Sequence, residues 1–197
     1  MLTEEIVGLV RYENGKVDHD PSGINCFTGD TKISLVDGRE IRIDDLIKEV
    51  KSGKINFVYS FNHEKNKIEP KQVIDGWCSG ISNKIVEIIL DNGEKIRCTP
   101  NHKFMLRDGS YCEAKDLICG DSLMPLYRKY PDKGLSNYRM YYDPMEDKWH
   151  YEHRQFVEEV LDEKYLVHHK DCNSKNNNPT NLIWCSIGAH QKIHNEL

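Results

Sequence analysis

Short runs of alternating apolar and polar residues, broken by turn residues, dominate the chain from residue 26 to about residue 126. A period of two is typical of β-strands that bury one face. The pairs Asp37-Gly38 and Asn92-Gly93 lie between such runs, so we expect each of them to close a two-residue hairpin. This segment is therefore predicted to be all-β. Its main runs are TKISLVDGREIRI, INFVYSFN, NKIVEIILDNGEKIRCT and HKFMLRDGSY.

Three other segments depart from this strand pattern. The run IDDLIKEVKSG predicts a short helix that begins near Asp44 or Asp45 and ends before Gly53. After Pro125 a Pro-, Gly- and Asn-rich linker is expected to run into a hairpin with its turn near Asp143-Pro144. Helices are predicted for residues 153–161 and 186–195, and turn and loop for residues 1–25.

The length and composition of the chain are sufficient for one large hydrophobic core or for two smaller ones. The chain has 197 residues, of which 38% are hydrophobic. No stretch approaches the roughly 20 apolar residues that cross a bilayer, and the first residues carry two acids where a signal peptide carries bases. We therefore expect a cytoplasmic protein with no membrane partner. Seven cysteines without a CxxC pair predict neither a disulfide framework nor a zinc ribbon.

The balance of charged residues bears on nucleic-acid binding. The formal net charge is −5, and from residue 127 onward 10 Lys or Arg face 11 Asp or Glu. Proteins that bind DNA phosphates usually present a basic surface. The charge balance therefore argues against tight non-specific DNA binding.

The first candidate chemistry lies at Cys26, which is followed by FTGDTKISLVDG. About seventy residues later the chain reads CTPNHKFMLRDG and then DLICGDSLMP. Together, in this order and spacing, these segments resemble the N-terminal and TxxH blocks of inteins and related Hint domains, over roughly residues 26 to 126. The resemblance implies a horseshoe-like β-domain that cleaves its own backbone.

A self-cleaving domain needs a nucleophile and a proton donor, because a peptide bond is a poor electrophile. By the resemblance, Cys26 takes the acyl group of residue 25 and a thioester forms. His102 can deliver the proton to the departing nitrogen, since its pKa lies near neutrality. Thr99 is expected to hold the same amide by a hydrogen bond. Without the two blocks, Cys26 is more simply a small buried residue.

The second candidate chemistry lies in LVHHKDCNSKNNNPTNLIWCSIGAHQKIH. His190 and His194 are four positions apart, which puts both rings on one helical face. The pattern resembles HNH, or ββα-metal, nucleases and covers about residues 150 to 195. The resemblance implies His169 as general base, Asn181 as the residue that fixes its loop, and one divalent metal ion. The expected metal ligands are His168, His190 and His194, and the ion is Mg, Mn, Zn or Ni.

Double-stranded DNA is the partner that this resemblance implies. Arg154, Lys170 and Asn177 are the expected DNA contacts. A structural zinc site stays open as an alternative, because Cys172 and Cys185 could complete four ligands.

The predicted organisation is α+β: a Hint domain (residues 26–126) followed by a linker and a small HNH domain (residues 127–197). Residues 1–25 are expected to be an N-extein remnant, and their Gly-Lys-Val-Asp-His run resembles a segment of phage terminase large subunits. A complete intein ends with two further sequence blocks, which are not found in this sequence. We therefore expect a C-terminal intein fragment that acts in trans, a decayed element or a truncated gene.

The function expected from these resemblances is autoprocessing at Cys26 combined with HNH homing endonuclease activity. The alternatives are a Hint autoprocessing module with a nuclease effector, or a split-intein fragment whose HNH domain only binds DNA.

Overall fold

The computed structural model describes residues 4–13, 16–18, 26–157 and 165–195, with the backbone alone described for residues 4–13, 16–18, 194 and 195. The chain divides into two compact units. The first comprises Met1–Leu35, Glu40–Val58 and Lys71–Pro125, and the second comprises Val36–Arg39, Tyr59–Pro70 and Leu126–Leu197. The main division falls next to residue 126, and two short preceding segments belong to the second unit.

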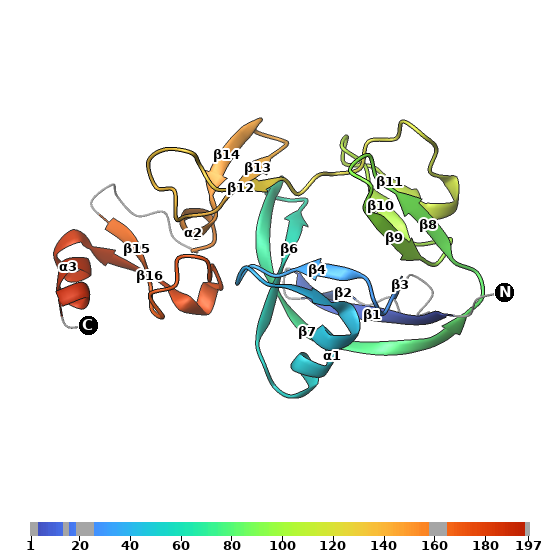
Figure 1. The fold of residues 1–197 in the computed structure, drawn as a ribbon, viewed down its shortest axis with the longest axis horizontal. Coiled ribbons are helices and arrows are strands. Elements are labelled where there is room, and N and C mark those ends of the chain that lie inside the picture. The colour runs from blue at the N-terminus through green and yellow to red at the C-terminus, as the bar shows by residue number, and fades with distance from the viewer. Residues whose placement is uncertain (1–3, 14–15, 19–25, 158–164, 196–197) are drawn as a thin grey trace. The chain divides into compact units, whose positions relative to one another are not determined.

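One sheet dominates the first unit, with strand order β6-β7-β1-β3-β9-β8 and β2 paired to β1 (Figure 1). Its strands are β1 (Glu4–Glu13), β2 (Lys16–Asp18), β3 (Phe27–Thr28), β6 (Asn56–Asn62), β7 (Lys67–Ser82), β8 (Val86–Ile89) and β9 (Lys95–Cys98). The loop prediction for residues 1–25 is wrong where β1 and β2 form. Strand β1 pairs antiparallel with β7, β3 and β2, and these neighbours satisfy its backbone groups. Residues 19–25 lie outside the described part.

Two small hairpins and two short helical segments complete the first unit. The hairpins pair β4 (Lys32–Ser34) with β5 (Glu40–Arg42) and β10 (Lys103–Met105) with β11 (Tyr111–Glu113). The helical segments are α1 (Ile43–Lys51) and the 3-10 turn η1 (Ala114–Asp116).

Helix α1 confirms the helix predicted from IDDLIKEVKSG. Its first turn carries Asp44 and Asp45, and its last turn carries basic residues, so both ends complement the helix dipole. Leu46 is fully buried in a cluster with Leu35, Val58 and Val73. Burying each such side chain contributes about 1.5–3 kcal/mol, so this cluster is a main source of the unit's stability.

The two Gly-containing turns form at the expected places but with longer loops. In the β8–β9 hairpin, Leu90 N–H donates to Glu94 O (2.9 Å) and Gly93 N–H donates to Leu90 O (2.9 Å). Gly93 has φ 84°, whereas Asn92 is not among the residues with positive φ. A two-residue turn of the favoured hand needs positive φ at both central residues. Gly38 (φ 96°) likewise has no neighbour with positive φ. The prediction of two-residue loops is therefore wrong for both hairpins.

The second unit consists of small sheets and short helices. Strands β12 (Arg128–Lys129), β13 (Met140–Asp143) and β14 (Lys148–Tyr151) form one sheet, and β15 (Tyr165–His169) pairs with β16 (Leu182–Ser186). The helical segments are α2 (Glu152–Gln155), η2 (Pro179–Asn181) and α3 (Ile187–Asn195).

The β13–β14 hairpin confirms the turn predicted at Asp143-Pro144. Helix α3 confirms the terminal helix within one residue. Helix α2 begins one residue before the predicted helix 153–161 and ends at Gln155, so the long helix is wrong in the described part. Residues 158–161 lie outside that part.

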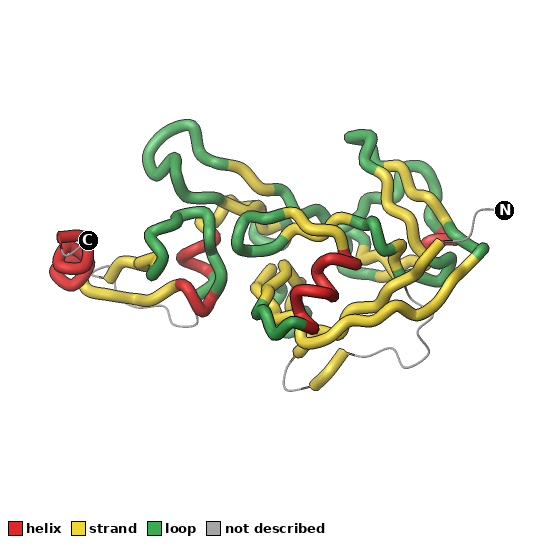
Figure 2. The backbone as a smooth tube through the Cα atoms, turned by 60° about the horizontal axis from the view of Figure 1, so that its bottom comes forward, coloured by secondary structure: helices red, strands yellow, loops and turns green. Residues whose placement is uncertain are grey.

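The chain is mostly β with few helices, which Figure 2 shows by the predominance of strands over helices. This composition is compatible with the β-rich Hint-like domain expected for residues 26–126. None of the seven cysteines, all within the described ranges, is in a disulfide bond. Across the described residues, no helix has the length and apolar character needed to span a bilayer.

Candidate functional site

Cys26 and Thr99 lie side by side because each adjoins one of two paired strands. Cys26 directly precedes β3, Thr99 directly follows β9, and the two strands pair at Phe27 and Cys98. The Cys26 N–H donates to Thr99 Oγ1 (3.1 Å), and the Thr99 N–H donates to Cys26 O (2.9 Å). Both residues are buried, at 1% and 5% exposure. The backbone nitrogen of Cys26 is thus held by a hydroxyl group away from solvent.

The thiol of Cys26 is directed toward a residue that sequence reasoning missed. Cys26 Sγ donates to Ser79 Oγ at 3.3 Å. Ser79 belongs to β7, within WCSGIS, where no motif distinguishes it. Only the pairing of strands far apart in the sequence brings this hydroxyl to the thiol.

His102 is fixed beside the same junction by a turn and by aromatic packing. Its backbone N–H donates to Thr99 O (3.0 Å), and its carbonyl accepts from Ala114 N (2.8 Å). The imidazole ring lies against Phe27, with 3.9 Å between ring centroids. Phe27 is the residue after Cys26, so the structure brings Cys26, Thr99 and His102 into one neighbourhood. Asn25 lies outside the described residues.

Asp30 supports the loop that follows the junction. Its Oδ1 accepts from the hydroxyl of Thr28 (2.7 Å), and its second oxygen pairs with Arg97. Burial alone raises the pKa of this carboxyl, but Thr28 and Arg97 together lower it below its ordinary value. Asp121 accepts from Ile118 N (2.9 Å) in another turn. Both carboxylates therefore stabilise turns of the first unit.

The histidine-rich segment forms a second cluster, in the second unit. His168 and His169 lie on β15 and are buried, at 4% and 5% exposure. The ring of His190, on α3, meets the ring of His168 edge-on, with 5.3 Å between centroids. A pocket of about 50 Å³ has room for a few water molecules, and it is lined by Tyr138, Val167, His168, His169, Cys172, Ser174 and His190.

The expected third ligand is not described at the level of its side chain. His194 lies on α3, but only its backbone belongs to the described part. Within that part, neither His168 nor His190 belongs to a group of three potential ligand atoms that all lie within 4.8 Å of one another. The same holds for Cys172 and Cys185. The structure therefore brings together one pair of the predicted metal ligands.

Asn177, one of the expected DNA contacts, lies next to His169. The side chain is fully buried, with 0% exposure. Its Oδ1 lies 3.1 Å from His169 Nε2, and its Nδ2 donates to Glu152 Oε2 (2.7 Å). Both polar ends of the side chain are therefore engaged inside the protein, one of them with the ring of His169.

Asn181 holds the loop that follows β15. Its Oδ1 accepts from Asp171 N (3.1 Å), and its Nδ2 donates to Asp171 Oδ1 (2.8 Å) and Asn176 O (2.9 Å). Burial raises the pKa of Asp171, but hydrogen bonds from Asn173, Asn176 and Asn181 lower it below its ordinary value. Asn181 thus ties down the loop, whereas direct contact with His169 comes from Asn177.

A buried ion pair anchors Asn177 in turn. Arg139 donates to Glu152 (Nε to Oε2, 2.8 Å), and the side chains are only 7% and 0% exposed. Arg139 Nη2 also donates to Tyr59 OH (2.7 Å) and to Val36 O (3.2 Å). Burial lowers the pKa of Arg139, yet Tyr59 and Glu152 raise it above its ordinary value. Sequence reasoning missed this network, because no local signal joins its members.

The other two expected DNA contacts lie at the surface. The guanidinium of Arg154 lies over the ring of Tyr151, 5.7 Å from its centroid. Lys170 is exposed and donates to Thr180 O (2.8 Å). Both cations therefore remain accessible to an anionic partner.

His153 packs between Tyr138 and His169, with centroid distances of 4.4 Å and 5.8 Å. The residue is 5% exposed, and its Nδ1 has no hydrogen-bond partner among the described residues. Burial, followed by the nearby His169 and Arg154, lowers the pKa of His153 to about 3. His153 is therefore neutral at ordinary pH, and its ring packs as an apolar group beside the histidine cluster.

Comparison with known proteins gives a match over most of the chain. Residues 33–194 match the family described as Intein splicing domain. The chain is 42% identical over 190 residues to a DNA gyrase subunit of Synechocystis sp., an alignment that covers 90% of this chain and 17% of that protein. It is 35% identical over 86 residues to the Replication factor C small subunit of Methanocaldococcus jannaschii, covering 44% of this chain and 4% of that protein.

A third relative is Elongation factor 2 of Methanopyrus kandleri, 32% identical over 152 residues, which are 66% of this chain and 11% of that protein. The chain thus matches only a small part of each of these three relatives, at most 17% of the relative's own length.

Proposed function

The chain belongs to the intein splicing domain family, and we propose that it cleaves its own backbone at Cys26 by an N–S acyl shift. The observation that carries this proposal is the buried hydrogen bond from Cys26 N–H to Thr99 Oγ1 at 3.1 Å. The nitrogen held by this bond is the one that must leave the acyl group. Thr99 and His102 stand at the spacing of the TxxH block, and both adjoin Cys26 or its neighbour Phe27.

The proposed shift forms one bond, breaks one bond and leaves the oxidation state unchanged. Cys26 Sγ attacks the carbonyl carbon of Asn25 and loses its proton. The carbon–nitrogen bond then breaks, and the Cys26 nitrogen leaves as an amine that takes up a proton. Ser79, which accepts from the thiol, supports the orientation of the nucleophile. His102 is the proposed source of the proton, because imidazole exchanges protons near neutral pH.

The test is cleavage by an added thiol, which intercepts a thioester. The purified full chain is incubated with dithiothreitol, and release of residues 1–25 is followed by mass spectrometry. We expect release from the native chain and none from Cys26→Ala. Cys98→Ala, which removes another buried thiol, is the matched control and should still cleave. Equal release from Cys26→Ala would remove Cys26 as the nucleophile.

Residues 1–25 are proposed to be the remnant of a host protein, residues 26–126 the splicing domain and residues 127–197 the linker and nuclease. The three relatives carry unrelated names, a gyrase subunit, a replication factor and an elongation factor, yet each shares a segment with this chain. A segment common to unrelated proteins supports a mobile element within a host. A C-terminal fragment acting in trans is the proposed partner for completing splicing.

As a second function, we propose that the histidine cluster belongs to an HNH endonuclease that cleaves double-stranded DNA. The edge-on pair of His168 and His190 supports this assignment, because it joins β15 to α3 across a small pocket. Two imidazoles fit a divalent transition metal. His168 and His190 would hold the ion, which when bound neutralises charge on the phosphate and the leaving oxygen. His169, oriented by Asn177, is the proposed base that takes a proton from water.

Cleavage of plasmid DNA with added Mg²⁺, Mn²⁺, Zn²⁺ or Ni²⁺ tests the nuclease. We expect cutting by the native chain and none by His169→Ala, which keeps the metal pair. His63→Ala, at an exposed position, is the control and should cut normally. Cutting that survives in His169→Ala would reject His169 as the base.

A further inference from the structure

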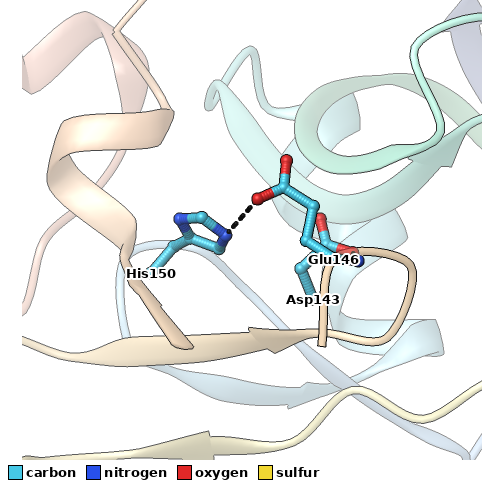
Figure 3. A group of neighbouring side chains, drawn as sticks. All are labelled: Asp143, Glu146 and His150. Atoms are coloured by element: carbon cyan, nitrogen blue, oxygen red, sulfur yellow. Dashed lines mark hydrogen bonds and ion pairs between the residues drawn. The ribbon is translucent and has the colours of Figure 1, made fainter. Parts of the chain in front are cut away.

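The β13–β14 hairpin carries a group of potential metal ligands away from the histidine pair. Asp143 ends β13, Glu146 lies in the turn, and His150 lies on β14. Each offers one ligand atom, and the three atoms all lie within 4.8 Å of one another. Figure 3 shows the carboxylate of Glu146 turned toward the ring of His150, with Asp143 beside Glu146.

Asp143 is a buried carboxylate at the start of the hairpin turn. It is 1% exposed, and its Oδ1 accepts from the N–H groups of Met145 (2.8 Å) and Glu146 (3.3 Å). Among the residues that the structure describes, no Lys, Arg or His forms an ion pair with it. A buried charge that lacks an opposite charge is costly. A cation bound at this point would offset the charge of the carboxylate.

His150 presents a nitrogen to the same point. Its Nε2 lies 3.1 Å from Glu146 Oε2, the contact dashed in Figure 3. That nitrogen is buried and makes no hydrogen bond to a described residue. This contact is an ion pair when the ring is protonated, and with Nε2 deprotonated the same two atoms are placed to bind one cation. Three donors of two kinds thus converge from one hairpin.

We propose that Asp143, Glu146 and His150 bind a divalent transition-metal ion, with Mn²⁺ or Zn²⁺ as the preferred class. Carboxylate oxygens suit Mn²⁺, imidazole suits Zn²⁺, and a mixed set serves both better than Mg²⁺ or Ca²⁺. The ion neutralises the two carboxylates, which otherwise repel each other. It also links the turn to β14, so binding stabilises the hairpin. The site is independent of the proposed nuclease.

Gln155 contacts the other ring nitrogen of His150. Its amide nitrogen Nε2 lies 3.5 Å from His150 Nδ1. Amide oxygen and nitrogen positions can be exchanged by a flip of the group. With the oxygen toward the ring, the amide accepts the Nδ1 proton and leaves the Nε2 lone pair for the metal.

Mn²⁺ titration of the full chain tests the site, with binding followed by electron paramagnetic resonance. The titration is done in a His168→Ala, His190→Ala background, so that the proposed nuclease ligands do not contribute. We expect one bound Mn²⁺, and added Zn²⁺ should displace it. Asp143→Asn keeps an oxygen for the turn N–H groups and should weaken Mn²⁺ binding at least about tenfold. His150→Gln should do the same.

Asp91→Asn is the matched control, because Asp91 is an exposed carboxylate in the turn of another hairpin and should leave Mn²⁺ binding unchanged. Thermal unfolding in EDTA checks that Asp143→Asn and His150→Gln remain folded. Absence of Mn²⁺ binding in the double-alanine background overturns the proposal. Equal binding by Asp143→Asn and the parent also overturns it. Failure of nuclease activity has no bearing on either result.

Discussion

Thr99 holds Cys26 from both sides: its hydroxyl accepts the Cys26 N–H at 3.1 Å, and its own N–H donates to the Cys26 carbonyl at 2.9 Å. The two residues are 73 positions apart. Their contact depends on the pairing of β3 with β9, so the fold of the first unit creates the junction. A buried polar contact of this kind restricts the amide to one orientation.

Two substitutions of Thr99 distinguish the effect of its hydroxyl group from the effect of the rest of its side chain. Thr99→Val keeps the shape but removes the acceptor for Cys26 N–H. Loss of a buried hydrogen bond costs about 1–3 kcal/mol, so thiol-induced release of residues 1–25 should slow by about tenfold to a hundredfold. Thr99→Ser keeps the hydroxyl and should stay near the native rate. Equal rates for the Val and Ser variants would show that the hydroxyl does not act on the junction.

The buried pair of Arg139 and Glu152 should be costly to break. Glu152→Leu leaves a buried guanidinium without its carboxylate, and the free energy of unfolding should fall by about 3–5 kcal/mol. Replacing both partners, as Arg139→Met with Glu152→Leu, should cost less, because no charge stays unpaired. Asp45→Asn, which breaks the exposed pair with Lys48, is the control and should cost about 0–1 kcal/mol. Urea unfolding measures the free energy of unfolding of the three variants. A double variant that is less stable than Glu152→Leu would show that the unpaired charge is not the main cost.

Acid should destabilise the second unit through His153. Its pKa is about 3 in the folded chain, mainly because of burial, whereas an unfolded histidine takes up a proton near pH 6.5. Between these values the unfolded state binds more protons, so stability is lost as the pH falls below about 6.5. The contribution is at most about 1.4 kcal/mol per pH unit.

Urea unfolding at about pH 7 and about pH 5 measures this loss. His153→Leu should flatten the dependence, and His63→Leu, at an exposed position, should keep the native slope. If His153→Leu loses as much stability on acidification as the native chain, the buried ring is not the cause.

Asn177 should control the orientation of His169. Asn177→Ala removes the oxygen that lies 3.1 Å from His169 Nε2. The imidazole signals of His169 should shift and broaden in the NMR spectrum, and metal-dependent DNA cleavage should fall about tenfold to a hundredfold. Asn173→Ala, an exposed change in the same loop, is the control. Unchanged His169 signals in Asn177→Ala would contradict the contact itself, whatever happens to cleavage.

Local signals explain what the sequence predicts well. Helix α1 has acids at its start and apolar residues at helical spacing, and the turn near Asp143-Pro144 has residues that break strands. The Cys26 and TxxH segments carry their chemistry in short motifs. Such features depend on a few neighbouring residues, which is why they can be read before any packing is known.

The missed features depend on contacts between distant residues. Ser79 reaches the Cys26 thiol only through strand pairing, 53 positions apart. Arg139 reaches Val36 across 103 positions. Asn177 looks like one more polar loop residue, and only its complete burial between Glu152 and His169 gives it a role. Sequence patterns do not contain the register that creates these contacts.

Chemical trapping of the acyl group on Cys26 tests the proposed N–S acyl shift. Hydroxylamine added to the full chain converts a thioester into a hydroxamate, whose mass identifies the residue that carried the acyl group. A thioester at Cys26 should give a fragment that ends in a hydroxamate on Asn25, formed by the native chain and absent from Cys26→Ala. Hydroxylamine also cleaves Asn-Gly bonds, so fragments that end at Asn14 or Asn92 are set aside. Absence of the Asn25 hydroxamate from the native chain, or the same fragment from Cys26→Ala, would contradict self-cleavage at Cys26.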